Sequence, residues 1–173
     1  MCVSSQFAHG WQLFLKSATF GTHLQSNGTS VGAHANSGAW EQWVAEPAGA
    51  SAAPGAVFIS NTAHNVRLSA SDDKKTLRVT PNRDAWEMFR IVEAPGAPGK
   101  YCIATHHGTY LSCEQTAVRQ SPNQSGWEQW EIAPVEGGHA RAQVGERGFG
   151  GLGVFRTGLS APSDGCVCVC VCV

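Results

Sequence analysis

The chain has 173 residues, of which 14% are charged, and its 12 Lys and Arg against 13 Asp and Glu give a formal net charge of −1. This length suits one domain, which can bury a core without disulfide bonds. The balanced charge argues against a nucleic-acid partner and against a membrane-surface partner, since both bind through an excess of positive charge. The 20 Gly and 8 Pro, among many Ser, Thr and Val, predict an all-β protein of short strands and turns.

Three repeats follow an N-terminal extension at residues 1–10. A Trp-Glu pair begins at Trp40, Trp86 and Trp127, with an aliphatic residue nine positions before each Trp and an Asn four positions before it. Upstream, a Leu follows an aromatic residue by ten positions, and a Gly or Asn three positions before that Leu suits a hairpin turn with positive φ. We therefore place the repeats at 11–46, 56–93 and 100–134, separated by Pro/Gly/Ala-rich linkers.

The repeats predict the fold, because one repeat of about four strands cannot bury its own apolar face. A propeller needs about four or more blades and usually shows a GH…WD pattern, which this sequence lacks. Three repeats closed around a pseudo-threefold axis instead predict a β-trefoil at residues 11–134. The apolar repeat positions give the expected core: Phe14, Leu24, Val31, Trp43, Phe58, Leu68, Leu77, Phe89, Tyr101, Leu111, Val118 and Trp130.

The Trp-Glu motifs are a candidate site. We expect Trp40, Trp86 and Trp127 to pack against the protein, with a ligand platform as the alternative. Their Glu neighbours occupy equivalent positions in different repeats, unlike the paired carboxylates of a glycosidase, so solvent or turn-bonding roles are expected. Without a GxSxG motif, a P-loop or zinc-ligand spacing, the sequence favours a non-enzymatic protein without metal, cofactor or small-molecule ligand.

The second and third repeats carry a family resemblance. The segments NVRLSASDDKKTLRV and AWEMFRI, and HHGTYLSCEQ and GWEQWEI, resemble the fascin-like β-trefoil family, which includes the actin-crosslinking fascins and the hisactophilins. The resemblance covers about Trp11 to Ala133 and implies binding or crosslinking of actin filaments in the cytoskeleton. The candidate partner-binding residues are the basic side chains of the second repeat: Lys74, Lys75, Arg78 and Arg83.

Other interpretations stay open. The basic residues also fit a solvated turn, since Asp72 and Asp73 offset part of their charge. Carbohydrate binding by a lectin-like trefoil is the alternative function, although the Gln-x-Trp motif of ricin-type lectins is missing. A scaffold domain for another protein is a further alternative. We also expect turn histidines, among them His64, His106 and His107, to be solvated.

The ends of the chain complete the predictions. The first 20 residues lack the features of a signal peptide and no apolar run reaches the length of a membrane helix, so a cytoplasmic protein is expected. In that reducing compartment Cys102 and Cys113 are expected as buried thiols. We interpret residues 135–173 as a low-complexity, disordered or artefactual tail, because its alternating Cys-Val end is what a TG dinucleotide repeat encodes. A metal-binding thiol tract and prenylation at Cys170 are the alternatives.

Overall fold

The computed structural model describes residues 12–135, which form twelve short β-strands and three 3-10 helices. The first repeat holds β1 (Gln12–Ser17), β2 (His23–Ser26), β3 (Val31–His34), η1 (Ala39–Glu41) and β4 (Gln42–Pro47). The second holds β5 (Ala56–Asn61), β6 (Val66–Ala70), β7 (Leu77–Thr80), η2 (Ala85–Glu87) and β8 (Met88–Glu93). The third holds β9 (Tyr101–Thr105), β10 (Tyr110–Glu114), β11 (Ala117–Ser121), η3 (Gly126–Glu128) and β12 (Trp130–Pro134).

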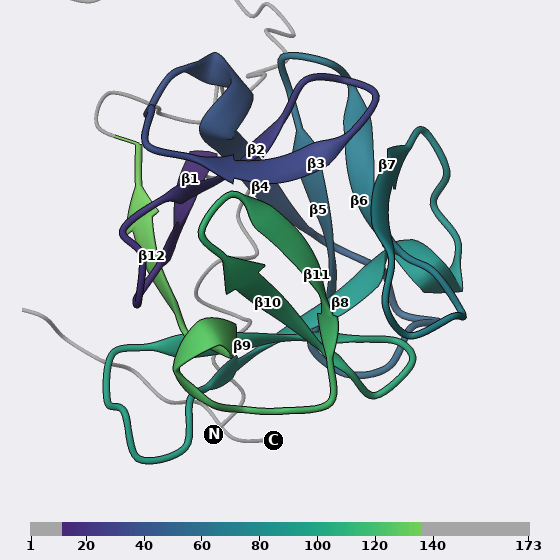
Figure 1. Cartoon of the computed structure of the whole chain (residues 1–173). Helices are drawn as coiled ribbons and strands as arrows, with labels where there is room; N and C mark the ends of the chain where they lie inside the picture. Colours follow the sequence, from purple (N-terminus) through teal and green to yellow (C-terminus); the bar gives the residue numbers. More distant parts are fainter. Residues whose placement is uncertain (1–11, 136–173) are drawn as a thin grey trace, which may run out of the picture. The chain divides into compact units, whose positions relative to one another are not determined.

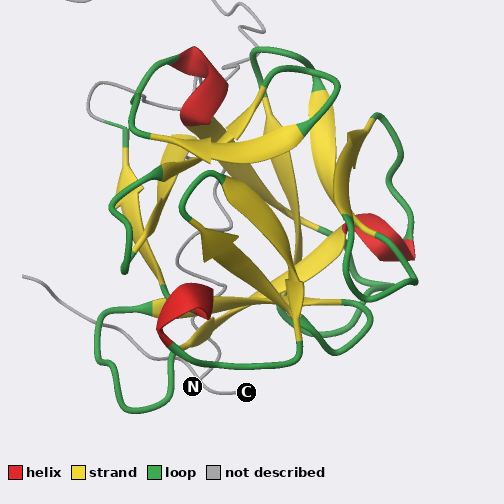
Figure 2. Cartoon of the chain, in the orientation of Figure 1, coloured by secondary structure: helices red, strands yellow, loops and turns green. Residues whose placement is uncertain are grey.

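The first and last strands of the three repeats close a six-stranded antiparallel barrel. β1 pairs with β4, β4 with β5, β5 with β8, β8 with β9, β9 with β12, and β12 pairs back with β1. The middle strands form the hairpins β2–β3, β6–β7 and β10–β11 (Figures 1 and 2). This is the β-trefoil architecture predicted from the repeats.

The hairpin turns have the backbone that the sequence predicts. Gly21, Asn65 and Gly108 take φ of 68°, 52° and 75°. Each stands in the turn between the first and second strands of its repeat. Because Gly and Asn adopt this left-handed region most easily, one of them stands at this turn position in all three repeats.

One large aromatic ring from the last strand of each repeat fills the core. Trp43, Phe89 and Trp130 are almost fully buried. The Trp43 Nε1–H donates to the Leu24 carbonyl at 2.9 Å, and the Trp130 Nε1–H donates to the Leu111 carbonyl at 3.1 Å. Both indoles therefore satisfy their one donor inside the core. Leu68 and Leu77 are also buried, and Val31, Tyr101 and Val118 pack against this core from partly exposed positions.

The structure differs from the expected core at Phe14, which is half-buried and packs against the His23 ring at 5.3 Å. Leu13 and Leu15 on either side of it are the buried residues of β1. Side chains alternate between the two faces of a strand, so an alignment shifted by one position selects the outer face. The third repeat caused the shift, because its first hairpin is one residue shorter.

The register shows the correct equivalence. Leu13, Val57 and Tyr101 lie opposite the three large rings, Trp43, Phe89 and Trp130 respectively. Phe58 is buried, but it lies outside the central cluster.

Two predictions lie outside the described residues: the extension at residues 1–10 and, apart from its first residue, the tail at 135–173. Cys102 and Cys113 are free thiols in the core. Burial, and then the charge of Glu128, raises the pKa of Cys102. Within residues 12–135 no helix is long and apolar enough to cross a membrane.

Candidate functional site

In each repeat a 3-10 helix that contains the Trp-Glu pair leads into the last strand. The Glu side chains are 2% exposed, and the Oε2 atom of each accepts the backbone N–H of the residue three positions earlier. The distances are 2.8 Å to Gly38, 2.9 Å to Asp84 and 2.9 Å to Ser125. The turn-bonding role of these carboxylates is therefore observed, whereas the alternative solvent role is wrong for Glu41, Glu87 and Glu128.

Glu128 has the most extensive bonding of the three. Its Oε2 also accepts the Ser125 hydroxyl at 2.8 Å. Burial raises the pKa of Glu128, but hydrogen bonds from surrounding serines outweigh burial and leave that pKa below its ordinary value. The carboxylate thus remains charged under the turn.

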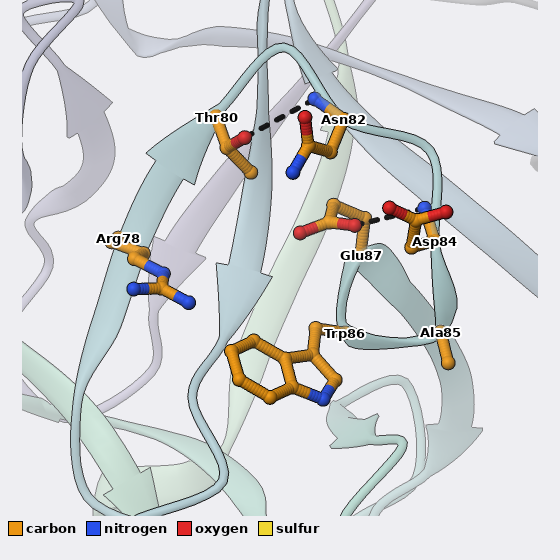
Figure 3. Close-up of a pocket in the computed structure, with 7 residues that line it drawn as sticks. All are labelled: Arg78, Thr80, Asn82, Asp84, Ala85, Trp86 and Glu87. Atoms are coloured by element: carbon orange, nitrogen blue, oxygen red, sulfur yellow. Dashed lines mark hydrogen bonds between the residues drawn. The ribbon is translucent and has the colours of Figure 1, made fainter.

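A pocket of about 590 Å³ opens beside η2 in the second repeat. Its lining residues are Arg78, Thr80, Asn82, Asp84, Ala85, Trp86 and Glu87. Thr80 Oγ1 accepts the backbone N–H of Asn82 at 3.1 Å, which fixes the chain where it leaves β7 (Figure 3). The Trp86 ring forms one wall, and polar side chains surround the remainder (Figure 3).

The third repeat carries the same pocket, with a volume of about 410 Å³. Every lining position of the second repeat has a counterpart 41 residues later: Arg119, Ser121, Asn123, Ser125, Gly126, Trp127 and Glu128. Ser121 Oγ accepts the Asn123 N–H at 3.1 Å, which reproduces the contact of the second repeat. Thr19 of the first repeat and Ser112 also line this pocket. We name the two cavities the repeat-2 pocket and the repeat-3 pocket.

The first repeat keeps part of the pattern. Asn36, Trp40 and Glu41 stand at the positions of Asn82, Trp86 and Glu87, 46 residues earlier in the chain. His34 Nδ1 accepts the Asn36 N–H at 3.2 Å. Gly32, however, replaces the arginine of the other two repeats.

The Trp residues of these motifs are surface residues to different degrees. Trp40 and Trp127 are 48% and 46% exposed, and Trp86 is half-buried. The exposed ring of Trp127, which lines the repeat-3 pocket, suits the alternative of a ligand platform better than the expected packing role, because ligand pockets are lined largely by hydrophobic and aromatic side chains.

Each of these Trp rings contacts a ring from the next repeat around the axis. His64 lies 5.4 Å from Trp40, His107 lies 5.8 Å from Trp86, and Phe20 lies 6.3 Å from Trp127. Each partner directly precedes the positive-φ residue of its hairpin. His64 and His107 are therefore half-buried packing residues, contrary to the expected solvated role, while His106 is exposed.

The four basic residues singled out in the sequence do not converge on one site. Lys74 and Lys75 are exposed in the β6–β7 turn, where Lys74 takes a φ of 57°. Arg78 lies in the repeat-2 pocket with its guanidinium carbon 5.1 Å from the centre of the Trp86 ring. Arg83 is directed elsewhere, to the Glu46 carboxylate at 3.1 Å.

Asp73 organises the β6–β7 turn. Its Oδ1 accepts the backbone N–H groups of Lys75 and Thr76 at 2.9 and 2.8 Å. Hydrogen bonds, first from the Thr76 side chain and then from these amides, lower the pKa of Asp73 to about 2. Of the two Asp residues beside the lysines, Asp73 therefore stabilises the β6–β7 turn.

The part of the chain that the structure describes contains no group of three or more His, Cys, Asp or Glu side chains placed to hold a metal ion. No protein-family model matches the chain. No curated protein matches it either.

Solved structures do resemble the chain. SeviL bound to asialo-GM1 saccharide superposes with a TM-score of 0.61 at 15% identity, over 72% of this chain and 97% of SeviL. The designed threefold-symmetric protein ThreeFoil gives a TM-score of 0.60 at 17% identity, over 72% of this chain and 99% of ThreeFoil. These comparisons give no support to the expected membership of the fascin-like family. At such identities the likeness shows the fold alone, and that fold is the all-β trefoil.

Proposed function

We propose that this chain is a lectin-like carbohydrate-binding module whose sugars occupy the pockets at the Trp-Glu turns. The observation that carries the proposal is that one pocket recurs in two repeats. Each of the seven lining positions of the repeat-2 pocket has a counterpart in the repeat-3 pocket. Core positions of a trefoil recur because packing requires it, but recurring polar residues around an open cavity point to a ligand.

The chemistry of the repeat-3 pocket suits a sugar ring. The exposed face of Trp127 offers a flat apolar surface to the C–H groups of a pyranose. Ser121, Asn123 and Ser125 supply hydroxyl and amide groups that donate and accept hydrogen bonds, which matches sugar hydroxyls. A volume of about 410 Å³ is in the range of small-ligand sites.

The same pocket favours binding without hydrolysis. Among its lining residues Glu128 is the sole carboxylate, and its Oε2 already accepts two hydrogen bonds from Ser125. Glycoside hydrolysis ordinarily needs two carboxylates across the scissile bond. The repeat-3 pocket is accordingly proposed to bind its sugar without hydrolysing it.

The comparison with SeviL supports the proposal at the level of the fold, since that β-trefoil is described in complex with a saccharide. Binding of actin filaments, which the fascin-like resemblance implies, is the second candidate. The exposed Lys74-Lys75 turn favours it, because a basic surface speeds the encounter with an acidic filament.

A glycan array and actin co-sedimentation separate the two candidates. We expect saturable binding to glycans on the array and no pelleting with actin filaments at low salt. The double variant Trp86→Ala, Trp127→Ala is expected to lose the glycan binding. A Lys74→Ala, Lys75→Ala variant is the matched control and retains glycan binding. Pelleting with actin that depends on these lysines, combined with an empty glycan array, would replace the proposal by the second candidate.

A further inference from the structure

The two pockets carry an arginine at the same position but in different electrostatic settings. In the third repeat the Arg119 guanidinium forms an ion pair with Glu114, the last residue of β10. Both side chains are partly exposed, and the pair spans neighbouring strands of one hairpin. Arg119 therefore has a carboxylate partner from the protein itself.

The second repeat lacks that carboxylate. Cys113 pairs with Val118 in the third repeat as Ala70 pairs with Leu77 in the second. Ser71, which follows Ala70, therefore takes the place of Glu114. Within residues 12–135 the Arg78 guanidinium has no hydrogen-bond or ion-pair partner, and its carbon lies over the Trp86 ring, 5.1 Å from the ring centre.

The ring contact holds the guanidinium in place without using its N–H groups. A guanidinium over an aromatic face keeps its five donors in the plane of the fork, ready for a planar or tetrahedral anion. Figure 3 shows Arg78 and Asp84 on opposite sides of the pocket. Glu87 lies between them, but it is buried and its Oε2 accepts the Asp84 N–H at 2.9 Å.

We infer that the repeat-2 pocket selects sugars that carry an acidic group, a carboxylate or a sulfate, and that Arg78 is the residue that recognises this group. The inference rests on the proposed carbohydrate-binding function. The repeat-3 pocket binds neutral sugars, because Glu114 neutralises its arginine. The first repeat, with Gly32 at this position, offers no cation there.

The test compares sugars that differ in the acidic group alone. Calorimetric titrations use glucose against glucuronate, galactose against galacturonate, and galactose against galactose 6-sulfate. In at least one of these pairs we expect the wild type to bind the acidic sugar about tenfold more tightly than the neutral one at low salt. This preference for the acidic sugar weakens as salt is added. Arg78→Gln removes the preference, whereas Arg119→Gln, the matched control, preserves it.

A gain-of-function variant completes the test. Glu114→Gln frees Arg119 from its ion pair, so we expect the repeat-3 pocket to become the second site of the chain that binds the acidic sugar. Thermal unfolding of each variant verifies that it is folded. Equal binding of acidic and neutral sugars, or loss of the preference in Arg119→Gln to the same extent as in Arg78→Gln, overturns the inference while carbohydrate binding stands. Failure of every sugar to bind the folded wild type refutes both proposals together.

Discussion

Replacement of Glu128 by alanine tests whether the buried carboxylates hold the Trp-Glu turns together. The change removes hydrogen bonds from the Ser125 amide and hydroxyl, at 2.9 and 2.8 Å, and leaves the amide without its partner. Each bond to a charged group contributes about 1.5–3 kcal/mol, and relief of the buried charge returns part of this. We expect a net loss of roughly 2–4 kcal/mol in the free energy of unfolding.

Thermal and urea-induced unfolding measure this loss, which corresponds to a fall in Tm of about 8–15 °C for a domain of this size. Glu131→Ala is the matched control, because Glu131 is the second residue of β12 and its side chain is 47% exposed beside Lys16. Its removal changes stability by less than about 0.5 kcal/mol. A Glu128→Ala protein as stable as the Glu131→Ala protein would show that the carboxylate does not support the turn.

The pH dependence follows from the direction of the Glu128 shift. Because its pKa is lower in the folded chain than the ordinary 4.5, its stabilising contribution is complete above that value and is lost as the pH falls through the folded pKa. Glu128→Gln removes the titration and retains a carbonyl oxygen. The difference in Tm between wild type and Glu128→Gln is expected to stay constant from pH 7 to about 5 and to narrow below 4.5. A difference that widens in acid would contradict the lowered pKa.

The remaining predictions concern packing. Trp130→Ala should cost roughly 3–5 kcal/mol in urea-induced unfolding, because the ring is fully buried, whereas Trp127→Ala should cost less than about 1 kcal/mol. Equal losses would place both rings in the core. Gly28→Ala should destabilise the chain by about 1 kcal/mol more than Gly49→Ala. Both glycines have positive φ, but only at Gly28 would the added Cβ approach the His64 ring to 3.0 Å, so equal Tm values would refute that contact.

The repeat pattern was sufficient to predict the fold. Apolar spacing and the turn residues Gly21, Asn65 and Gly108 are local features, so they can be recognised without knowing which strands meet. The exact register was not accessible in this way. Phe14 is apolar although it lies on the outer face, and a pattern of residue types does not distinguish it from Leu13.

The pockets were missed for a different reason. The lining residues come from the stretch between β7 and η2 in the second repeat and mostly from that between β11 and η3 in the third. In the sequence each stretch is typical of a polar loop, and its residues come together only in the folded turn (Figure 3). A signal was nonetheless present in the sequence: Arg78 and Asn82 recur as Arg119 and Asn123 at the same spacing as the Trp-Glu pairs. The contacts between the Trp rings and the next repeat could not be predicted, because they join side chains that are far apart in the chain and that a local pattern of residue types does not connect.

The most direct test of the account is a two-dimensional ¹H–¹⁵N NMR titration of the labelled chain with a glycan that binds on the array. Carbohydrate binding in the repeat pockets predicts saturable shifts of the Trp86 and Trp127 indole signals and of the Asn82 and Asn123 side-chain amides, with the buried Trp130 indole signal unmoved. If the glycan shifts the signals of other surface residues and leaves the two indole and two side-chain amide signals of the pockets unchanged, the account is contradicted.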